Sequence, residues 1–174
     1  MINLDAIETE RLLLRRPEIK DRGNLQRLYK DEKTRAFLGG PVSDQEFQER
    51  MEKLMFQWQK YQFGPWVVTE KCSWEMLGIS GLHHSDEGIE LSYMFFPTYW
   101  GKGYAYEVAL KVIEIAFNIL ELGCIVAITQ KMNERSCALL EKLGFVFRYR
   151  FERFNEMQCF YELRQNKTLN SENH

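Results

Sequence analysis

The chain has 174 residues, of which 45% are hydrophobic and 14% aromatic, so it is long enough for one domain with a sizeable core and too apolar to be disordered throughout. Lys and Arg total 23 against 25 Asp and Glu, a net charge of -2, and this balance argues against a nucleic-acid or anionic-membrane partner. The opening "MINLDAIETE" lacks the basic and apolar regions of a signal peptide, and the run "VIEIAFNIL" is interrupted by Glu114 and Asn118 and is too short to span a membrane.

The N-terminal third predicts one strand and two helices. The run "RLLLRR" (11–16) is predicted as a short strand, and Asp21 is placed to cap a short helix after it. Ser43 and Glu46 have the spacing of a capping box, which predicts the start of a second helix. Apolar residues then recur at helical spacing, namely Phe47, Met51, Leu54, Met55 and Trp58.

Three strands and a long helix are predicted in the middle of the chain. The strands cover 66–70, 76–84 and 88–96, and the last of them alternates its side chains with a period of two. One apolar face of the following helix is formed by Ala105, Val108, Ala109, Val112, Ala116 and Ile119. The nearly all-apolar run "CIVAITQ" (124–130) is typical of a strand covered on both faces.

The C-terminal third predicts one helix and two strands. Asn133 is placed to cap the helix and Gly144 to end it, with strands at about 145–154 and 157–164. The resulting order, β-α-α-β-β-β-α-β-α-β-β, predicts an α/β fold in which one mixed sheet carries helices on both faces.

The extent of the domain and its compartment follow from the remaining composition. We expect one domain over residues 1–164 and a polar, disordered tail at 165–174. Because the cysteines form no closely spaced pair, we expect free thiols in a reducing, cytoplasmic environment and no metal site. They are Cys72, Cys124, Cys137 and Cys159.

The stretch "FFPTYWGKGYAYE" places Gly101 and Gly103 between a strand and a helix. Such a turn exposes backbone N–H groups beside the positive end of the helix dipole, which suits a phosphate. A Walker loop, G-x-x-x-x-G-K-[ST], is absent from the sequence, and a dinucleotide fingerprint would need a glycine where Tyr106 stands. The third pattern is the loop Gln/Arg-x-x-Gly-x-Gly/Ala of the acyl-CoA N-acyltransferases, which "WGKGYA" matches except that Trp100 replaces Gln or Arg. The alternative is a glycine turn that only lets a strand enter a helix.

Several blocks spaced over the chain carry a resemblance to this family. They are "ETERLLLRR", "FLGGPVS", "FGPWVV", "LGISGL", "IELSYMFFPTYWGKGYAYE" and "NERSCALLEKLGF". From Glu8 to Leu163 the sequence resembles the GNAT superfamily, and within it the branch with the ribosomal-protein N-terminal (alanine/serine) acetyltransferases. The resemblance implies the GNAT fold, with a central mixed, mostly antiparallel sheet of about seven strands and helices on both faces.

The resemblance also implies acetyl-CoA as co-substrate, in a cleft between the strands at 88–96 and 124–130. The pantetheine arm is expected to pair with the backbone of Met94 and Phe96, whose side chains would equally suit a core. The pyrophosphate is expected on the backbone N–H groups of Gly101, Lys102, Gly103, Tyr104, Ala105 and Tyr106.

Five side chains near this ligand carry separate expectations. Lys102 either adds a point charge or is only an exposed lysine, and Tyr106 stands where this branch commonly has Thr. Asn133 matches the family's CoA-contacting asparagine and also suits a plain helix cap. Ser136 can face the thioester sulfur or be only a polar residue near that cap. Many relatives have, where this chain has Leu140, a tyrosine that protonates the departing CoA thiolate. In this chain Ser136 or a water would have to do so.

The acceptor amine must be neutral to attack the thioester, so a general base is expected. Glu90 lies near where the superfamily often places a glutamate and is the candidate, acting directly or through a water; the alternative is a structural carboxylate. Other carboxylates, His83 or His84 could take the role instead. A solvated turn describes "GLHHSDEG" better, and adjacent strand histidines face opposite ways, which makes them poor joint metal ligands. We expect direct transfer in a ternary complex, with no acylated cysteine.

Two other kinds of function stay open. A non-catalytic CoA-binding sensor or protein-interaction module could use the same fold, and the missing tyrosine favours it. The run "FVFRYRFERF" could bind nucleic acid, but we favour a strand with Phe147, Tyr149 and Phe151 buried and its arginines in water. We therefore expect no nucleic-acid or membrane partner. The acceptor is expected to be a small-molecule amine or a protein N-terminus, and the protein a monomer or homodimer.

Overall fold

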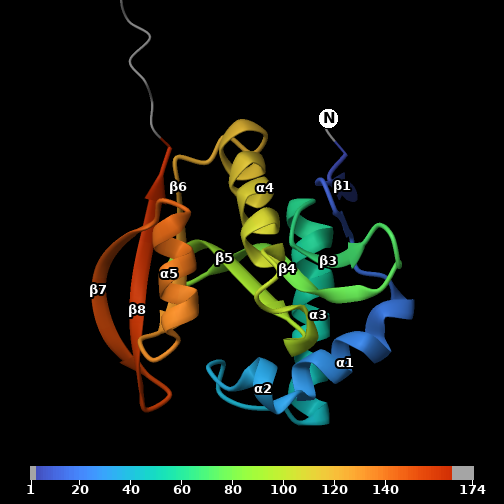
Figure 1. Ribbon diagram of the computed structural model, residues 1–174, viewed down its shortest axis with the longest axis horizontal. Helices are drawn as coiled ribbons and strands as arrows, with labels where there is room; N and C mark the ends of the chain where they lie inside the picture. The colour runs from blue at the N-terminus through green and yellow to red at the C-terminus, as the bar shows by residue number, and fades with distance from the viewer. Residues whose placement is uncertain (1–2, 166–174) are drawn as a thin grey trace, which may run out of the picture.

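One mixed sheet of eight strands organises the chain, in the order β1-β2-β3-β4-β5-β6-β8-β7. This computed structural model describes residues 3–165 (Figure 1). Neighbouring strands are antiparallel except β5 and β6, which are parallel. The strands are β1 (Ala6–Glu8), β2 (Leu12–Arg15), β3 (Pro65–Glu70), β4 (Met76–Ser85), β5 (Gly88–Phe95), β6 (Cys124–Gln130), β7 (Val146–Arg153) and β8 (Glu156–Arg164).

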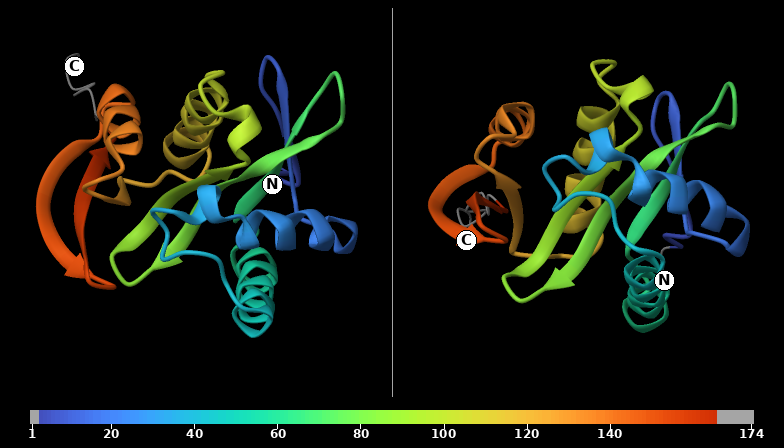
Figure 2. Two further views of the ribbon diagram at one scale, coloured as in Figure 1. Left: turned by 60° about the horizontal axis from the view of Figure 1, so that its bottom comes forward. Right: turned by 90° about the horizontal axis from the view of Figure 1, so that it is seen from below.

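Helices cover both faces of the sheet, as the element order predicts. Figures 1 and 2 show α4 and α5 on one face and α1, α2 and α3 on the other. The helices are α1 (Arg22–Lys30), α2 (Glu32–Arg35), α3 (Asp44–Tyr61), α4 (Tyr104–Asn118) and α5 (Glu134–Lys142), with short 3-10 turns at Ile19–Asp21 and Pro97–Tyr99.

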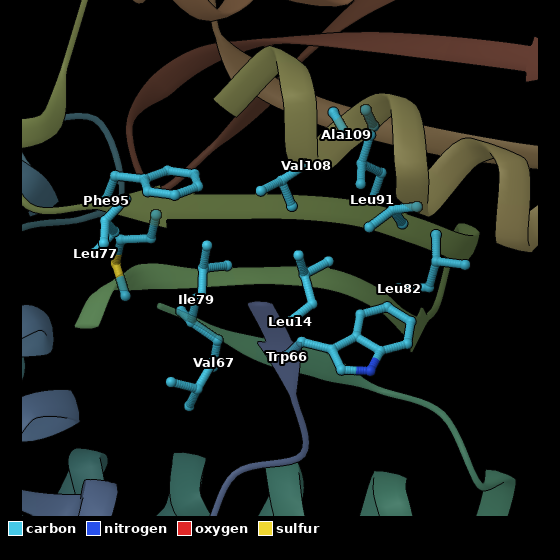
Figure 3. Close-up of a cluster of buried hydrophobic side chains, with 14 of the residues drawn as sticks. Leu14, Trp66, Val67, Leu77, Ile79, Leu82, Leu91, Phe95, Val108 and Ala109 are labelled. Atoms are coloured by element: carbon cyan, nitrogen blue, oxygen red, sulfur yellow. The ribbon is translucent and has the colours of Figure 1, made fainter. Parts of the chain in front are cut away.

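The core fills the space on each side of the sheet. Val108 and Ala109 of α4 are fully buried and lie over Leu91 of β5 (Figure 3). On the opposite face, Trp58 of α3 packs edge-on against Trp66 of β3, with ring centroids 5.5 Å apart. These contacts hold β5 and α4 in fixed relation, and the candidate site lies where the two elements meet.

Two short elements escaped the sequence-based prediction, which gave about seven strands and four helices. β1 has only 3 residues and α2 only 4, too few for a side-chain period to be read. Asp31 caps α2 by accepting a hydrogen bond from the backbone N–H of Thr34 at 2.7 Å. Both elements depend on local capping or on one neighbouring strand rather than on a hydrophobic pattern.

The positions of the helix starts were predicted well, but only some of the predicted capping hydrogen bonds are present. Ser43 and Glu46 form the predicted capping box of α3, with hydrogen bonds of 2.8 and 3.2 Å. Asp21 does precede α1, but its carboxylate makes no cap bond and instead binds the Arg15 guanidinium at 2.5 Å. An ion pair with the neighbouring strand replaces the expected cap at Asp21.

The expectation of buried aromatic residues in β7 is wrong. Phe147 is 43% and Tyr149 50% exposed, because β7 is an edge strand and its register shifts between these two residues. A bulge of this kind breaks the alternation of buried and exposed positions. Arg148 and Arg153 are paired with Glu162 and Glu87, so two of the arginines that could have bound phosphates already have carboxylate partners.

Three smaller observations complete the fold. The four cysteines are free thiols. Within residues 3–165, no helix has both the length and the apolar character needed to cross a bilayer. The predicted tail at 165–174 lies outside the described residues except for Gln165, whose backbone N–H donates to Gly123 O at 3.1 Å.

Candidate active site

The parallel strands β5 and β6 pair at one point only. Their register consists of the single pair Glu90 and Val126, whereas β4 and β5 pair along the whole length of β5. Beyond this pair the two strands run apart (Figure 1), and in the described part of the chain β5 has no further pairing on that side. An edge opened inside a sheet offers backbone hydrogen bonds to an extended guest, as an added strand would use them.

The backbone groups that face this opening differ from those predicted. The N–H of Phe96 donates to Leu77 O at 2.9 Å and its C=O accepts from Tyr99, so both groups are already used. The carbonyl oxygen of Met94 also faces β4, since a Cβ on Gly78 would lie 2.1 Å from it. Strand groups alternate in direction, so Tyr93 and Phe95 direct their N–H groups to the β6 side.

This alternation of backbone directions corrects which residues are expected to pair with the pantetheine arm. The predicted pairing with the backbone of Met94 and Phe96 would require groups that bind within the sheet. The expectation is one residue out along β5, because the backbone groups that face β6 are set by the pairing with β4, which the sequence of β5 alone does not determine. Tyr93 and Phe95 take their place as candidates.

The glycine turn before α4 has the predicted geometry. Gly101 and Gly103 have φ of 75° and 79°, in the left-handed region that glycine tolerates best. The first backbone bond of the helix runs from Glu107 N to Gly103 O, at 3.0 Å. The amides of Tyr104, Ala105 and Tyr106 precede it, so they lack intrahelical acceptors and remain available to an anion.

A clasp that the sequence did not reveal holds this turn from the outside. Arg11, at the end of the β1–β2 hairpin, donates to the carbonyl oxygen of Lys102 at 2.9 Å and pairs with Glu107 at 2.7 Å. Hydrogen bonds from Thr9 and from the Arg11 backbone and side chain outweigh the effect of burial and lower the pKa of Glu107. The hairpin therefore fixes both the turn and the first turn of α4.

The side chains of Lys102 and Tyr106 lie beside the turn in cation–π contacts. The Lys102 ammonium is 5.5 Å from the centroid of Tyr99, and the Lys142 ammonium is 4.3 Å from that of Tyr106. Lys142 is the last residue of α5, so this second contact joins the end of α5 to the start of α4. Among the described residues, neither cation forms a salt bridge with a carboxylate.

Trp100, which replaces the Gln or Arg of the family pattern, has a structural role. Its indole N–H donates to Phe95 O at 2.8 Å and thereby anchors the turn to the end of β5. Tyr104, the first residue of α4, donates its hydroxyl to Glu70 at 2.6 Å. Since this side chain is engaged with β3, only its backbone N–H faces the turn.

The start of α5 brings Asn133, Ser136 and Tyr93 together. The Asn133 side chain accepts from the Ser136 N–H at 3.3 Å, as a helix cap does. The Ser136 hydroxyl lies 2.7 Å from the Tyr93 hydroxyl, so α5 is joined to β5 across the opening. Sequence analysis singled out Asn133 and Ser136 but treated Tyr93 only as one member of an alternating strand.

Leu140 lies one turn further along α5 and belongs to the core. It is only 1% exposed, in a position where many relatives have a tyrosine. Leucine supplies no ionisable group, so any proton donor in the opening must come from another residue. At the start of α5, the Ser136 and Tyr93 hydroxyls are hydrogen-bonded to each other.

Glu90 lies at the point where β5 and β6 diverge. Its side chain is 15% exposed, and burial, reinforced by the charge of Glu87, raises its pKa to about 7 against the opposing effects of Ser85 and Arg153. A carboxyl group with this pKa is partly ionised at neutral pH and can accept a proton there. Burial, rather than a hydrogen-bonding partner, tunes it.

The histidines of "GLHHSDEG" lie in strand β4, so the predicted solvated turn is wrong. His83 pairs in register with Glu90, with 3.7 Å between Nε2 and the carboxylate, and His84 stacks on Tyr61 at 3.7 Å between ring centroids. Burial lowers the pKa of both imidazoles. Neutral His83 therefore lines the same end of the opening as Glu90.

Glu90 and Tyr93 project from opposite faces of β5, because successive side chains alternate and the two positions differ by three. Tyr93 is on the α5 side, where it meets Ser136, and Glu90 is on the side of α1 to α3 with His83. A guest held between the strands would thus meet a proton acceptor on one face and hydroxyl donors on the other. Such an arrangement could accept a proton on one face and stabilise negative charge on the other.

Comparison with known proteins agrees with this geometry. The model of the family described as "Acetyltransferase (GNAT) domain" matches residues 11–146. Among curated sequences, the chain is 26% identical to the uncharacterized protein YkkB of Bacillus subtilis over 88% of this chain and 92% of that one, and 29% identical to the uncharacterized N-acetyltransferase YoaA of the same organism over 80% and 81%.

Solved structures share the fold over nearly the whole chain. An acetyltransferase from Agrobacterium tumefaciens superposes with a TM-score of 0.85 at 22% identity, covering 95% of this chain and 97% of that one. A spermidine N-acetyltransferase from Vibrio cholerae in complex with CoA and spermine gives 0.78 at 22% identity, covering 92% and 99%. A ribosomal-protein-S5-alanine acetyltransferase from Vibrio fischeri gives 0.77 at 18%, covering 93% and 97%. Sequence, fold and opened sheet agree, and the chain belongs to the GNAT family of N-acyltransferases.

Proposed function

We propose that this protein transfers the acetyl group of acetyl-CoA to a primary amine by direct attack in a ternary complex. The observation that carries the proposal is the opening between β5 and β6, which has the free amides of the α4 turn at one end and Glu90 at the other. Acetyl-CoA supplies a thioester activated for acyl transfer. The chain's own residues would bind it, orient it and move one proton.

The residues present fit coenzyme A by its chemistry. The backbone N–H groups of 101–106 and the α4 dipole suit the diphosphate, with the Lys102 ammonium nearby. The backbone groups of Tyr93 and the N–H of Phe95 suit the amides of the pantetheine arm, while the Phe95 carbonyl is already bonded to Trp100. Asn133 lies at the start of α5 on the other side.

Glu90 is proposed as the general base, directly or through a water. An alkyl amine with a pKa near 10.4 is far less often neutral at pH 7 than an α-amine near 8, a difference of about 3.3 kcal/mol. A base is therefore more important for polyamine-like acceptors than for protein N-termini. Burial keeps Glu90 near the pKa that a base at neutral pH needs.

Direct transfer is favoured over an acylated cysteine. Burial is the main cause that raises the pKa of Cys137, which follows Ser136, and of Cys124 at the start of β6. A raised pKa lowers the thiolate fraction, and the thiolate is the nucleophile. Trapping an acetyl group on any of the four cysteines during turnover would contradict this proposal.

The acceptor is proposed as a primary amine of a small molecule or of a protein N-terminus. Structural neighbours include one enzyme named for spermidine and one named for a ribosomal-protein alanine. Membership of the ribosomal-protein branch rests on the sequence blocks around Glu90 and Asn133 and is also a proposal. Free cysteines agree with a reducing compartment, for which we propose the cytoplasm, with the protein as monomer or homodimer.

An amine panel tests the proposal. The protein is incubated with acetyl-CoA and, separately, spermidine, amino acids, an aminoglycoside and peptides with free N-termini, and thiol release is followed together with the mass of the acceptor. We expect thiol release that depends on one class of amine and an acceptor heavier by one acetyl group. CoA binding without thiol release for any amine would favour the non-catalytic sensor on the same fold.

A further inference from the structure

A hydrogen bond between two hydroxyls crosses the opening of the sheet. The Tyr93 hydroxyl on β5 and the Ser136 hydroxyl on α5 are 2.7 Å apart, and either atom can be the donor. Ser136 is 8% exposed, and Asn133 holds its backbone N–H at 3.3 Å. The serine is therefore fixed at its backbone by the helix cap and at its side chain by Tyr93.

Counting protons shows what this pair can offer. Each hydroxyl carries one hydrogen, and their mutual bond uses one of the two, so one O–H remains to be donated elsewhere. A phenol is more acidic than an aliphatic alcohol and is the better donor. When Tyr93 donates to Ser136, the hydrogen that remains belongs to the serine.

Tyr93 keeps its proton under all conditions in which the protein would work. Burial, opposed by the bond with Ser136, raises the pKa of Tyr93 to about 12. The thiol of a cysteine has a pKa of about 8.5, so a departing thiolate cannot remove the tyrosine proton to any useful extent. Tyr93 is thus suited to hold Ser136 and unsuited to act as an acid itself.

We propose that Tyr93 is a positioning residue that turns the Ser136 O–H toward the departing sulfur, in place of the tyrosine that Leu140 replaces. This inference rests on the proposed function. The amine nitrogen forms its bond to the acetyl carbon, the C–S bond breaks with its electron pair on sulfur, and the amine proton passes to Glu90. Ser136 stabilises the thiolate by hydrogen bonding, so no proton has to leave either hydroxyl.

A double-mutant cycle tests this role with the acceptor found in the amine panel. Ser136→Ala is expected to lower kcat about 100-fold, as the loss of one preorganised donor does. Tyr93→Phe is expected to lower kcat about 10-fold through misplacement of that donor, with KM for acetyl-CoA unchanged. The double variant should match Ser136→Ala, because Tyr93 acts only through the serine. Titration with CoA counts the folded sites, so that kcat is given per binding-competent protein.

Tyr161→Phe is the matched control. Tyr161 also donates its hydroxyl from the sheet to α5, to Glu141 at 3.2 Å, and its loss is expected to leave kcat unchanged. If the two single-variant losses of kcat multiply in the double variant, or if Tyr93→Phe keeps the wild-type kcat, this inference fails while the proposed function stands. Wild-type protein that releases no thiol with any amine would overturn the proposed function and this inference with it.

Discussion

At the scale of single residues, burial is the main influence on the chemistry of Glu90. Its side chain is 15% exposed, and the nearest imidazole nitrogen, of His83, lies 3.7 Å away, beyond a hydrogen bond. Desolvation disfavours the charged carboxylate and raises the pKa to about 7. The same desolvation has one consequence for catalysis and another for stability, and both can be measured.

Replacing Glu90 by Gln tests the catalytic consequence. The variant should lose at least about 100-fold in kcat and the inflection near pH 7 in its pH–rate profile, because the base that titrates there is gone. Steady-state kinetics from pH 5.5 to pH 9 with a fixed amine measures both. A variant whose profile keeps the wild-type shape would remove Glu90 from the mechanism.

The same variant tests the effect on stability. The carboxyl group has a folded pKa of about 7 against an ordinary 4.5, so the folded state prefers the protonated form and loses stability as pH rises between these values. Glu90→Gln should therefore be more stable than wild type by up to about 3 kcal/mol at pH 8, and by almost nothing at pH 4. Urea unfolding at several pH values measures the difference. A difference independent of pH would show that Glu90 is not desolvated.

Some single residues could be read from the sequence and others could not. Glu90, Asn133 and Ser136 belong to blocks that resemble a family, so their positions carried information. Tyr93 lies in the same block as Glu90, but its contact could not be read there, because its bond to Ser136 joins segments 43 residues apart. The direction of the backbone of Met94 and Phe96 depends on the register with β4, which a hydrophobic pattern leaves undetermined.

At the scale of elements, the β1–β2 hairpin is what keeps the α4 turn in shape. Arg11 bonds to the Lys102 carbonyl and to Glu107, one on each side of Gly103. A turn that is held open before a ligand arrives loses less conformational entropy on binding. On the proposed function, the hairpin would contribute to binding without itself offering the backbone amides.

Replacing Arg11 by Met should weaken coenzyme A binding about 10-fold while leaving the binding of pantetheine unchanged, since only the diphosphate uses the turn. Calorimetric titration of both ligands measures this. Lys111→Met is the control, because it removes one positive charge from the exposed face of α4, where Lys111 pairs with Glu114. Equal weakening by the two variants would mean that net charge, rather than the clasp, controls affinity.

Elements with strong local signals were predicted to within a few residues. The capping box at Ser43 and the apolar face of α4 are signals of this kind, because capping and helical periodicity depend on neighbours in sequence. β1 was missed because three residues give no period, and the bulge in β7 disrupted the alternation that predicted buried aromatics.

At the scale of the whole molecule, the proposed function depends on the gap between the parallel strands β5 and β6. The order β5-β6-β8-β7 places β6 beside β5 and β8, although α4 separates β5 from β6 in sequence. Such pairing is set by contacts distant in sequence, and only the family resemblance anticipated it. The glycine turn, the buried Glu90 carboxyl group and the Tyr93–Ser136 hydroxyl pair come from three separate regions of the chain and lie along this opening.

The most direct test of the account is an NMR titration of backbone amides with coenzyme A. The amides of 101–106 should show the largest shifts and become protected from exchange, because they would bind the diphosphate, while pantetheine should leave them unchanged. Saturation with coenzyme A that leaves the amides of 101–106 unshifted would contradict the proposed site at the start of α4.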